Sequence, residues 1–546
     1  MSDPQQFNTF SHAQSHKMLF PQSIYMSIVL FATVVASAVV LRIIYYLFLH
    51  PLSKFPGPWY ASVSSLPLAL LSVLGYETAW LLSLAKKYGN KRPIRITPDT
   101  ILFSRPSSLK DIYWNPKLNT KGSFYTSGVL GPTNLFTTID GDDHKALRKA
   151  LTGPKVPWST GALKTKWEHR FDYQVTLLIS KLRQRAINGD IVSLCDKVAY
   201  VLSHVRLKLS FDILFLENSE FAADIMTMLT FNEPWGFVEN GRDERNLLRS
   251  WRNGLAAFGF STRFRFYRNV ILKSPLGVFF LPRIGNEDGM GYLMGQADKQ
   301  VTEREKELED FGGSKDDAKD FLQHALEAKL DGQPLSPVQK RAHTTLLIMA
   351  GADTTGSALG TTLRFLLKNP EALKRAHVEI LKAEEAKLLS APILYDESYQ
   401  HLPFIGACIR ESLRLQPPAP MILTRLTPPE GIAIDGHWAP GGFEVLCHSA
   451  ITQRDPDVYT PDPDVWRPER WLVSKEILNK YESLNFVFGM GPRVCLGKDI
   501  ALMELWKLIP ELIRRLDMDL IREGEHVNIG GIAYNKDLLV KLTSRD

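Results

Sequence analysis

One ten-residue stretch near the C-terminal end constrains the fold of this 546-residue chain more than any other feature. It reads Phe488-Gly-Met-Gly-Pro-Arg-Val-Cys-Leu-Gly497, and its glycines allow positive φ angles and close backbone approach. A helical pattern begins at Lys498, so Cys495 lies just before a helix start, where the helix dipole favours a thiolate over a thiol. The stretch therefore predicts a tight loop that wraps against a flat ligand and presents a sulfur atom to it.

The residues around this cysteine narrow the choice of ligand. Arg493 would place a fixed positive charge near the thiolate, which suits a carboxylate substituent on whatever the sulfur binds. No second Cys or His lies at the spacing of a zinc site. A single thiolate in a dry loop beside a cation is what a haem iron needs as its proximal ligand. The alternative interpretation is a buried core cysteine in a glycine-rich turn.

The pattern F-G-x-G-x-R-x-C-x-G resembles the haem-binding loop of the cytochrome P-450 monooxygenases. The family's other main motifs are also present, in the order that the family has. The resemblance covers roughly residues 45 to 546. It implies the cytochrome P-450 fold, mainly α with small β sheets, preceded by one N-terminal transmembrane helix. It also implies haem b as the cofactor, with Cys495 as the axial ligand of the iron.

A long helix is predicted from Ser336 to Lys368. Ser336-Pro-Val-Gln339 combines a capping box with proline at the first helical position. Gly351, in the middle, costs about 1 kcal/mol of helix propensity against alanine, so we expect a kink or a close approach there. Asp353 lies in the same apolar run, where an acid is costly to bury unless it is hydrogen-bonded or functional.

The middle of this helix resembles the oxygen-activating A-G-x-D-T-T element of the family. The resemblance implies that Asp353 and Thr354 are an acid–alcohol pair that delivers protons while oxygen is activated. The small residues Ala350 and Gly351 would leave room over the face of the haem.

Three further positions resemble those that contact the haem propionates in this family. Asp143-His-Lys-Ala-Leu-Arg148 begins a helix on which His144 and Arg148 share a face. His144 stands where the family usually has Trp, and it retains a hydrogen-bond donor. Without the other motifs, this pair would be interpreted as a solvated helix face. Arg425 lies in a stretch that resembles the strand carrying another propionate contact.

Two more segments are predicted to line the pocket. Ala419, Met421, Ile422 and Leu423 precede Arg425 and are expected to face the substrate side of the haem. Residues 531–534 are expected to form the last pocket-lining turn.

A structural network is predicted from two short motifs. Glu411-Ser-Leu-Arg414 lies on an amphipathic helix, where such a pair alone is usually a surface ion pair. Pro468-Glu-Arg470-Trp follows at the spacing at which the family adds a second arginine. The resemblance implies a buried Glu-Arg-Arg network that holds the proximal side of the haem.

The N-terminal residues predict a membrane anchor. Residues 1–20 are polar and are expected to be a disordered lumenal tail. Ile24–Leu41 contains no charged residue, and its helical length of about 27 Å is close to that of a bilayer core. We place the anchor at 21–49, a proline-rich linker at 50–60 and the haem-thiolate monooxygenase domain at 61–546. A cleaved signal peptide is the alternative.

The charges around this segment predict its topology. Arg42 and Lys54 follow the apolar run, so the positive-inside rule leaves the catalytic body in the cytosol. The linker Phe48-Leu-His-Pro-Leu-Ser-Lys-Phe-Pro-Gly-Pro58 resembles that of membrane-bound fungal members of the family. The resemblance implies a single-pass protein of the endoplasmic reticulum membrane and a fungal source.

The composition excludes other classes of protein. Lys and Arg exceed Asp and Glu by 65 to 59, a net charge of +6 without basic blocks, which does not indicate nucleic-acid binding. Four cysteines (Cys195, Cys408, Cys447 and Cys495) do not make a disulfide framework in so long a chain, and a reducing compartment fits best.

The resemblance implies a monooxygenase that hydroxylates, epoxidises or desaturates a small apolar substrate, and the fungal-type linker favours secondary-metabolite biosynthesis. The chain ends soon after the haem loop, so we expect electrons from a separate NADPH–cytochrome reductase, with cytochrome b5 as a second candidate partner. Two alternatives remain open: a haem-thiolate isomerase or dehydratase that needs no electrons, and a non-catalytic haem protein.

Overall fold

The computed structural model describes residues 22–89, 92–152, 158–194, 218–311 and 320–545. The chain forms two compact units, residues 1–53 and residues 54–546. The predicted tail at residues 1–20 lies outside the described residues, as does Cys195.

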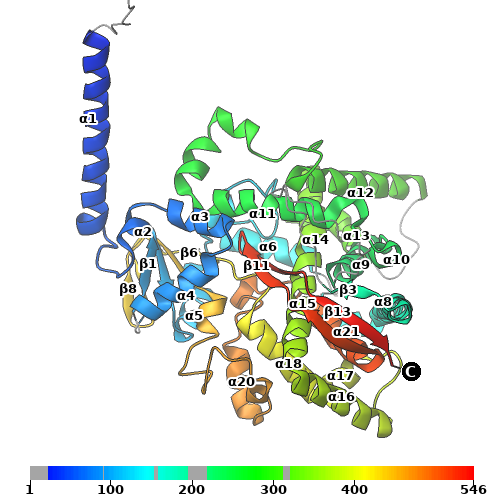
Figure 1. Cartoon of the computed structure of the whole chain (residues 1–546). Helices are drawn as coiled ribbons and strands as arrows, with labels where there is room; N and C mark the ends of the chain where they lie inside the picture. The colour runs from blue at the N-terminus through cyan, green and yellow to red at the C-terminus, as the bar shows by residue number, and fades with distance from the viewer. Residues whose placement is uncertain (1–21, 90–91, 153–157, 195–217, 312–319, 546) are drawn as a thin grey trace, which may run out of the picture. The chain divides into compact units, whose positions relative to one another are not determined.

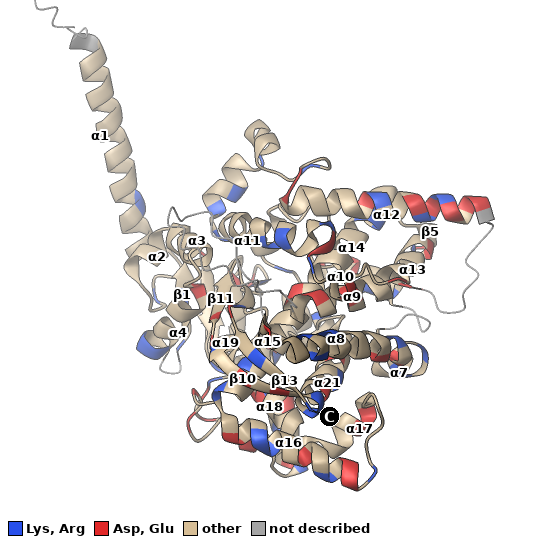
Figure 2. Cartoon of the chain, turned by 45° about the vertical axis from the view of Figure 1, so that its right-hand side comes forward, with Lys and Arg blue, Asp and Glu red and all other residues tan. Residues whose placement is uncertain are grey.

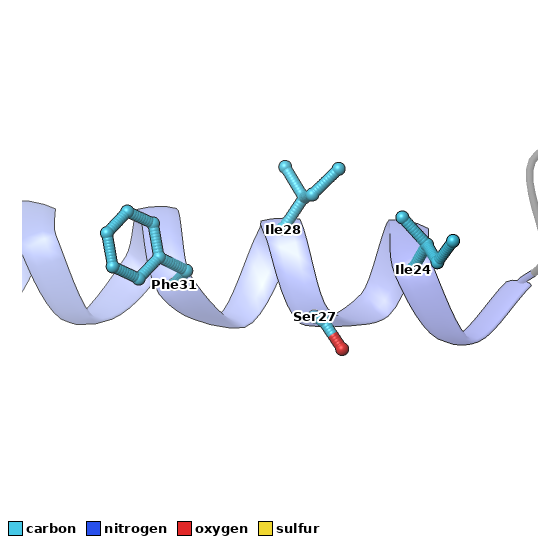
Figure 3. A pocket seen from close by; sticks show the side chains of 4 residues that line it. All are labelled: Ile24, Ser27, Ile28 and Phe31. Carbon is cyan, nitrogen blue, oxygen red and sulfur yellow. The ribbon is translucent and has the colours of Figure 1, made fainter.

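The described part of the first unit is an apolar helix, α1 (Gln22–Ile44), that continues into a π-helical turn at Tyr45–Leu49. The 26 residues Ile24–Leu49 are long and apolar enough to cross a membrane, a property that anchors and signal sequences share. Ile24, Ile28 and Phe31 are among its exposed side chains, and Figure 3 shows them projecting from the helix. Figure 2 shows α1 almost without charged residues, in contrast to the helices of the second unit.

The second unit consists mainly of helices (Figure 1). They are α2 (Trp59–Val63), α3 (Leu66–Val73), α4 (Glu77–Tyr88), α5 (Ser107–Tyr113), α6 (Gly141–Leu151), α7 (Thr160–Lys166), α8 (Glu168–Asn188), α9 (Asn218–Phe231), α10 (Phe237–Asn240), α11 (Leu247–Arg263), α12 (Gly289–Phe311), α13 (Phe321–Glu327), α14 (Pro337–Ala350), α15 (Ala352–Lys368), α16 (Pro370–Glu385), α17 (Tyr395–His401), α18 (Pro403–Leu415), α19 (Ser449–Thr452), α20 (Lys475–Ser483) and α21 (Lys498–Arg515).

The strands are short and form small sheets. They are β1 (Ile94–Thr97), β2 (Thr100–Phe103), β3 (Ile191–Ser193), β4 (Lys329–Leu330), β5 (Gln333–Pro334), β6 (Arg425–Leu426), β7 (Ile432–Ile434), β8 (His437–Ala439), β9 (Glu444–Cys447), β10 (Leu516–Arg522), β11 (Glu525–Ile529), β12 (Ile532–Lys536) and β13 (Leu539–Ser544).

The largest described sheet has the order β1-β2-β9-β6. Its β2–β9 pair is parallel, whereas β1–β2 and β6–β9 are antiparallel. A second sheet has the order β10-β13-β3, and the pairs β11–β12, β4–β5 and β7–β8 complete the set. The antiparallel pairing of β6 with β9 fixes Arg425 opposite Val445. The predicted fold class, mainly α with small β sheets, is confirmed.

The helix pair α14–α15 runs through the middle of the second unit (Figure 1), where α15 packs against α9, α18 and α21. Ser336 caps α14 with the predicted capping box, because its side chain accepts from the Gln339 amide while the Gln339 side chain accepts from the Ser336 amide. The expected long helix is divided at Gly351, whose φ and ψ of −89° and −39° stay in the right-handed helical region, and α15 begins at the next residue. The break positions the start of α15 against α9.

Candidate active site

The second unit contains a cavity of about 350 Å³. Its walls come mainly from α6, α14, α15, the segment before β6 and the loop before α21. Among the described residues that line it, none is Asp or Glu. Six of the predicted site residues line this cavity, and Asp353 does not; the six are His144, Arg148, Thr354, Arg425, Arg493 and Cys495.

The loop that carries Cys495 needs glycine for backbone reasons. Gly489 and Gly491 have φ angles of 71° and 73°, in the left-handed region. A Cβ atom on Gly491 would overlap the carbonyl oxygen of Tyr113, so this position also requires close backbone approach. The amide of Cys495 donates to the carbonyl of Phe488 at 2.8 Å and closes the loop. The tight glycine-rich loop predicted from the sequence is confirmed.

Cys495 faces the cavity, whereas Cys408 and Cys447 are buried away from it. The Cys495 side chain is exposed to the cavity, and the protein packed around the loop desolvates its thiol and raises the pKa of that thiol, despite the opposing effects of the Gly497 amide and the Arg148 charge. The local loop therefore favours the thiolate less than the sequence indicates. A cation bound at the sulfur would supply the missing stabilisation of the thiolate.

Basic side chains gather at one part of the cavity wall, and we call Lys121, Arg148, Arg425 and Arg493 the cation cluster. Each donates to backbone carbonyls. The Arg148 guanidinium donates to Val494 at 2.8 Å, Arg425 to Thr424 at 3.0 Å, and Lys121 to Phe136 at 2.6 Å. Arg493 donates to the carbonyls of Asn119 and Ile139 at 2.6 and 3.1 Å.

His144 lies within reach of all four cations. Burial, together with the charges of Lys121, Arg493, Arg148 and Arg425, lowers the pKa of His144 to about 3. Burial, together with the positive charges of the three arginines of the cluster, lowers the pKa of Lys121 well below its usual value. His144 is therefore neutral at physiological pH, and the cluster holds an excess of positive charge facing the cavity.

Lys121 is a site residue that the motifs missed. It lies in the irregular segment before the Ser123–Thr126 turn, where no motif, periodicity or helix face marks it. Its side chain is buried and its amide donates to the Ile139 carbonyl, which holds the segment beside the start of α6. Only the tertiary fold brings it to Arg425 and Arg493.

Asp353 and Thr354 have different surroundings. The Thr354 side chain lines the cavity, and its hydroxyl donates to the Ala350 carbonyl at 2.8 Å. Asp353 is 1% exposed and pairs with Arg252 of α11, at 2.5 Å between Oδ1 and Nη2. The structure therefore places the two members of the predicted acid–alcohol pair in different surroundings, and their role in proton delivery stays a prediction. Consecutive residues of a helix point about 100° apart, and α11 packs on the side that Asp353 faces.

Gly351 separates the two helices for a steric reason. A Cβ atom there would overlap the side chain of Met226 from α9. The expected close approach at Gly351 is confirmed, and Ala350, Gly351 and Thr354 all border the cavity.

Two of the pocket predictions are wrong. Ala419, Met421 and Leu423 line the cavity, but Ile422 is buried in the core cluster that includes Leu446 and Ile451. Side chains of successive residues in an extended segment alternate between faces, so a run of four cannot all face one cavity. Residues 531–534 are also absent from the described cavity wall, and Ile532 and Tyr534 lie in the same core cluster as Ile422.

The Glu411 network (Glu411, Arg414 and Arg470) is present and buried. The carboxylate accepts from Arg414 at 2.8 Å and from Arg470 at 2.9 Å. Trp471 Nε1 and the Arg467 amide donate to it at 2.9 Å each. The network ties α18 to the 468–471 turn, as predicted.

The cavity fits the haem that the loop motif implies. Its mostly apolar wall suits a macrocycle, and the sulfur of Cys495 faces into it. The cation cluster offers an excess of buried positive charge with no acidic side chain among the described lining residues, which suits carboxylate substituents.

Comparisons with known proteins agree with this geometry. A family model described as Cytochrome P-450 matches residues 83–532. The cytochrome P-450 monooxygenase mfmA of Annulohypoxylon moriforme is 28% identical over 482 residues, which cover 86% of this chain and 88% of the relative. The monooxygenase gsfF of Penicillium aethiopicum is 29% identical over 512 residues, with coverage of 91% and 94%.

A third relative, the cytochrome P-450 monooxygenase pkfB of Emericella nidulans, is 28% identical over 477 residues, with coverage of 86% and 87%. All three organisms are fungi, which agrees with the fungal resemblance of the linker. The model match spans most of the chain, including both the Asp353–Thr354 helix and the Cys495 loop. The chain therefore belongs to the cytochrome P-450 family of haem-dependent monooxygenases.

Proposed function

We propose that this protein uses O2 to hydroxylate, epoxidise or desaturate a small apolar substrate at a haem whose iron is bound by Cys495. The observation that carries the proposal is one cavity that combines the Cys495 sulfur, the cation cluster and the Thr354 hydroxyl. Each of these groups has a separate task in such a reaction, and they come from segments far apart in the sequence.

The first task is to hold the haem. Cys495 would hold the haem iron through its sulfur, and because burial raises the pKa of its thiol, iron binding would supply the energy for deprotonation. Arg148, Arg425 and Arg493 are the proposed partners of the two propionates, and neutral His144 adds an N–H donor. Lys121 adds a fourth basic side chain at the same place.

The second task is to handle protons. The bound haem supplies the activation of O2 and the oxidising power of the reaction. The Thr354 hydroxyl donates a hydrogen bond to the Ala350 carbonyl. Its oxygen can therefore accept a hydrogen bond from the cavity side. Asp353, one residue earlier, is the proposed source of protons for Thr354.

Replacement of Thr354 by alanine tests this role. The side chain shrinks little, so fold and iron ligation should survive, but proton transfer through the hydroxyl is lost. NADPH and O2 should still be consumed, with a larger share of the O2 released as hydrogen peroxide. An unchanged peroxide share would show that Thr354 is structural, and the isomerase and non-catalytic alternatives would be reopened.

The proposed electron donor is an NADPH–cytochrome reductase, with cytochrome b5 as a second donor. The inner face of α6 carries His144 and Arg148, while Lys145 and Lys149 are exposed on its outer face. This pair offers a basic surface, close in the chain to the cation cluster, for an acidic redox partner.

The proposed location is the endoplasmic reticulum membrane, crossed once by α1 with the body in the cytosol. The support is the apolar span Ile24–Leu49 and the positive charges that follow it. Protease added outside intact microsomes should digest the body, and full protection of the body would contradict this topology.

The two alternatives make different demands on electrons. An isomerase or dehydratase would act without NADPH, and a ligand carrier would not consume O2. NADPH-dependent O2 uptake by membranes that contain the protein and a reductase, stimulated by substrate, separates all three. Fungal relatives and the fungal-type linker support a role in secondary-metabolite biosynthesis, and the metabolites that accumulate after deletion of the gene would identify the substrate.

A further inference from the structure

A second histidine, His343 of α14, borders the same cavity as His144 but has different electrostatic surroundings. Burial and then the charges of the cation cluster lower the pKa of His144, whereas burial alone lowers the pKa of His343 to about 4. His343 therefore lies apart from the basic side chains that we assign to the haem propionates. Its ring is neutral at physiological pH.

One ring nitrogen of His343 is occupied by the backbone of a neighbouring segment. The Leu135 amide donates to Nδ1 at 3.4 Å, and both residues are buried. Because Nδ1 accepts this hydrogen bond, it carries the lone pair, and the proton of the neutral ring is on Nε2. The contact also ties α14 to the segment before α6. His343 is therefore an N–H donor at Nε2, on a ring whose orientation is fixed from its other side.

This Nε2–H group has no acceptor among the residues that the structure describes, although His343 is only 3% exposed. A buried donor without an acceptor is unfavourable, and folded proteins contain few of them. Two other neutral donors of the cavity wall are satisfied within the protein. Trp158 Nε1 donates to the Leu151 carbonyl at 3.0 Å, and the Thr354 hydroxyl has its own carbonyl acceptor. The His343 donor differs from these because it is left for a ligand.

The cavity wall next to His343 is apolar. Leu346 and Leu347 follow it on α14, and these two side chains and Leu135 all line the cavity. A hydrogen bond in such surroundings is stronger than in water, so it distinguishes a ligand with an acceptor from one without. His343 also precedes Ala350 by two turns of α14, about 10 Å along the helix axis. An oxygen held at Nε2 is therefore separated from the Ala350 end of the cavity.

We infer that His343 determines substrate specificity by donating a hydrogen bond from Nε2 to a carbonyl, ether or hydroxyl oxygen on an otherwise apolar substrate. The oxygen anchors one part of the substrate at His343, and the apolar remainder extends toward Ala350 and Thr354, where oxidation takes place. The substrate is then already oxygenated, so an earlier oxygen-introducing or carbonyl-forming reaction must supply it. This inference rests on the proposed function of the cavity and adds the class of substrate.

Two substitutions of His343 separate the donor from the contact with Leu135. An Asn side chain places its amide near the position of Nδ1, so His343→Asn keeps an acceptor for the Leu135 amide but has no donor at the Nε2 position. A Gln side chain reaches the Nε2 position with its amide, so His343→Gln keeps a donor there. His448→Gln, at a buried histidine outside the described cavity wall, controls for the loss of a buried imidazole.

The probes are N-alkyl imidazoles, which bind to the haem iron of the holoprotein through nitrogen and shift its Soret band. Chains of increasing length are each paired with the same chain ending in a methyl ketone, and Kd is measured from the Soret shift. In wild type, the ketone of the matching length should bind roughly 3- to 10-fold more tightly than its alkyl partner. The preference should disappear in His343→Asn and persist in His343→Gln and His448→Gln.

The outcomes that contradict the inference are distinct from a failure of the proposed function. A wild-type protein that prefers no ketone of the series would overturn the inference, as would a preference that survives in His343→Asn. A preference lost equally in His343→Asn and His343→Gln, or in His448→Gln, would show that the Nε2 donor is not its source. If the alkyl compounds give no Soret shift in wild type, the proposed function fails instead.

Discussion

The Glu411 network and the cation cluster both gather basic side chains away from the surface, the first fully buried and the second buried or half-buried, but their charges are balanced differently. In the Glu411 network, Arg414 and Arg470 share one carboxylate, and Trp471 and the Arg467 amide complete its hydrogen bonds. In the cation cluster the donors reach backbone carbonyls, and no Asp or Glu occurs among the described residues that line the cavity.

This difference separates a structural element from a binding site. A buried charge is expensive unless it is paired, so a complete network is stable within the protein alone. Burial first, and then the positive charges of the neighbouring basic groups, lower the pKa values of His144 and Lys121, so the basic groups of the cation cluster repel one another. An anionic ligand relieves that repulsion. The incomplete balance of charge is therefore the physical signature of the carboxylate-binding site.

The largest expected effect comes from breaking the complete network. Glu411→Gln leaves Arg414 and Arg470 without their shared counter-charge, so the free energy of unfolding should fall by about 3–5 kcal/mol. Chemical unfolding followed by circular dichroism measures this loss. The control is Glu482→Gln on α20, which removes the exposed partner of Arg410, a neighbour of Glu411 on α18. This change should lower the free energy of unfolding by roughly 0–1 kcal/mol. Equal losses of unfolding free energy in the two variants would show that the buried network contributes no more than an exposed ion pair.

Removal of a cation from the cation cluster should act on the ligand instead of the fold. Arg493→Met deletes a charge-assisted partner of a haem carboxylate, so haem retention should weaken roughly 10- to 100-fold. The rate of haem transfer to an acceptor apoprotein measures retention. The haem-free variant should lose less stability than Glu411→Gln, because the loss of the Arg493 hydrogen bonds is partly offset by the removal of one repulsive charge. A loss of stability as large as that of Glu411→Gln would identify the cluster as structural.

A smaller effect is expected at a buried histidine outside the cation cluster. Burial lowers the pKa of His448 from 6.5 to about 4, so the folded protein keeps it neutral where the unfolded chain binds a proton. The free energy of unfolding therefore falls as the pH drops from about 6.5 toward 4, and at pH 5.5 this one histidine lowers it by about 1.4 kcal/mol relative to neutral pH.

His448→Gln should therefore flatten the acid side of the stability–pH curve. The exposed His169, changed in the same way, should leave the curve as it is. An acid side that is equally steep in wild type and His448→Gln would show that other groups control acid unfolding.

The smallest effect is expected on the outer face of α6. Reversal of charge at the exposed Lys145 and Lys149 should slow electron transfer from the reductase severalfold at low salt and much less at high salt. Haem content should be normal, in contrast to Arg493→Met. Lys374→Glu on α16 is a control for the loss of an exposed lysine. Unchanged turnover at limiting reductase would exclude this surface.

The features that could be predicted from the sequence are those defined by local chemistry. The glycines around Cys495, the capping box at Ser336 and the helix break at Gly351 each follow from residues close in the chain. The two halves of the Glu411 network lie farther apart, and only the family resemblance connects them.

The features that could not be predicted depend on tertiary contacts. Arg252 lies 101 residues before Asp353, and nothing in its own helix indicates that partner. Lys121 lies in an irregular segment without a pattern. The different surroundings of Asp353 and Thr354 could have been predicted, because consecutive residues of a helix point in different directions. The burial of Ile422 away from the cavity could also have been predicted, because side chains alternate between the two faces of an extended segment.

The most direct test of the account is the carbon monoxide spectrum of the reduced protein in three forms. Wild type and Cys408→Ala, which removes a buried cysteine away from the cavity, should both give a thiolate-type spectrum. Cys495→Ala should abolish that spectrum, because it removes the cysteine that faces the cavity beside the cation cluster. A thiolate-type spectrum that persists in Cys495→Ala, or is lost only in Cys408→Ala, would contradict the account.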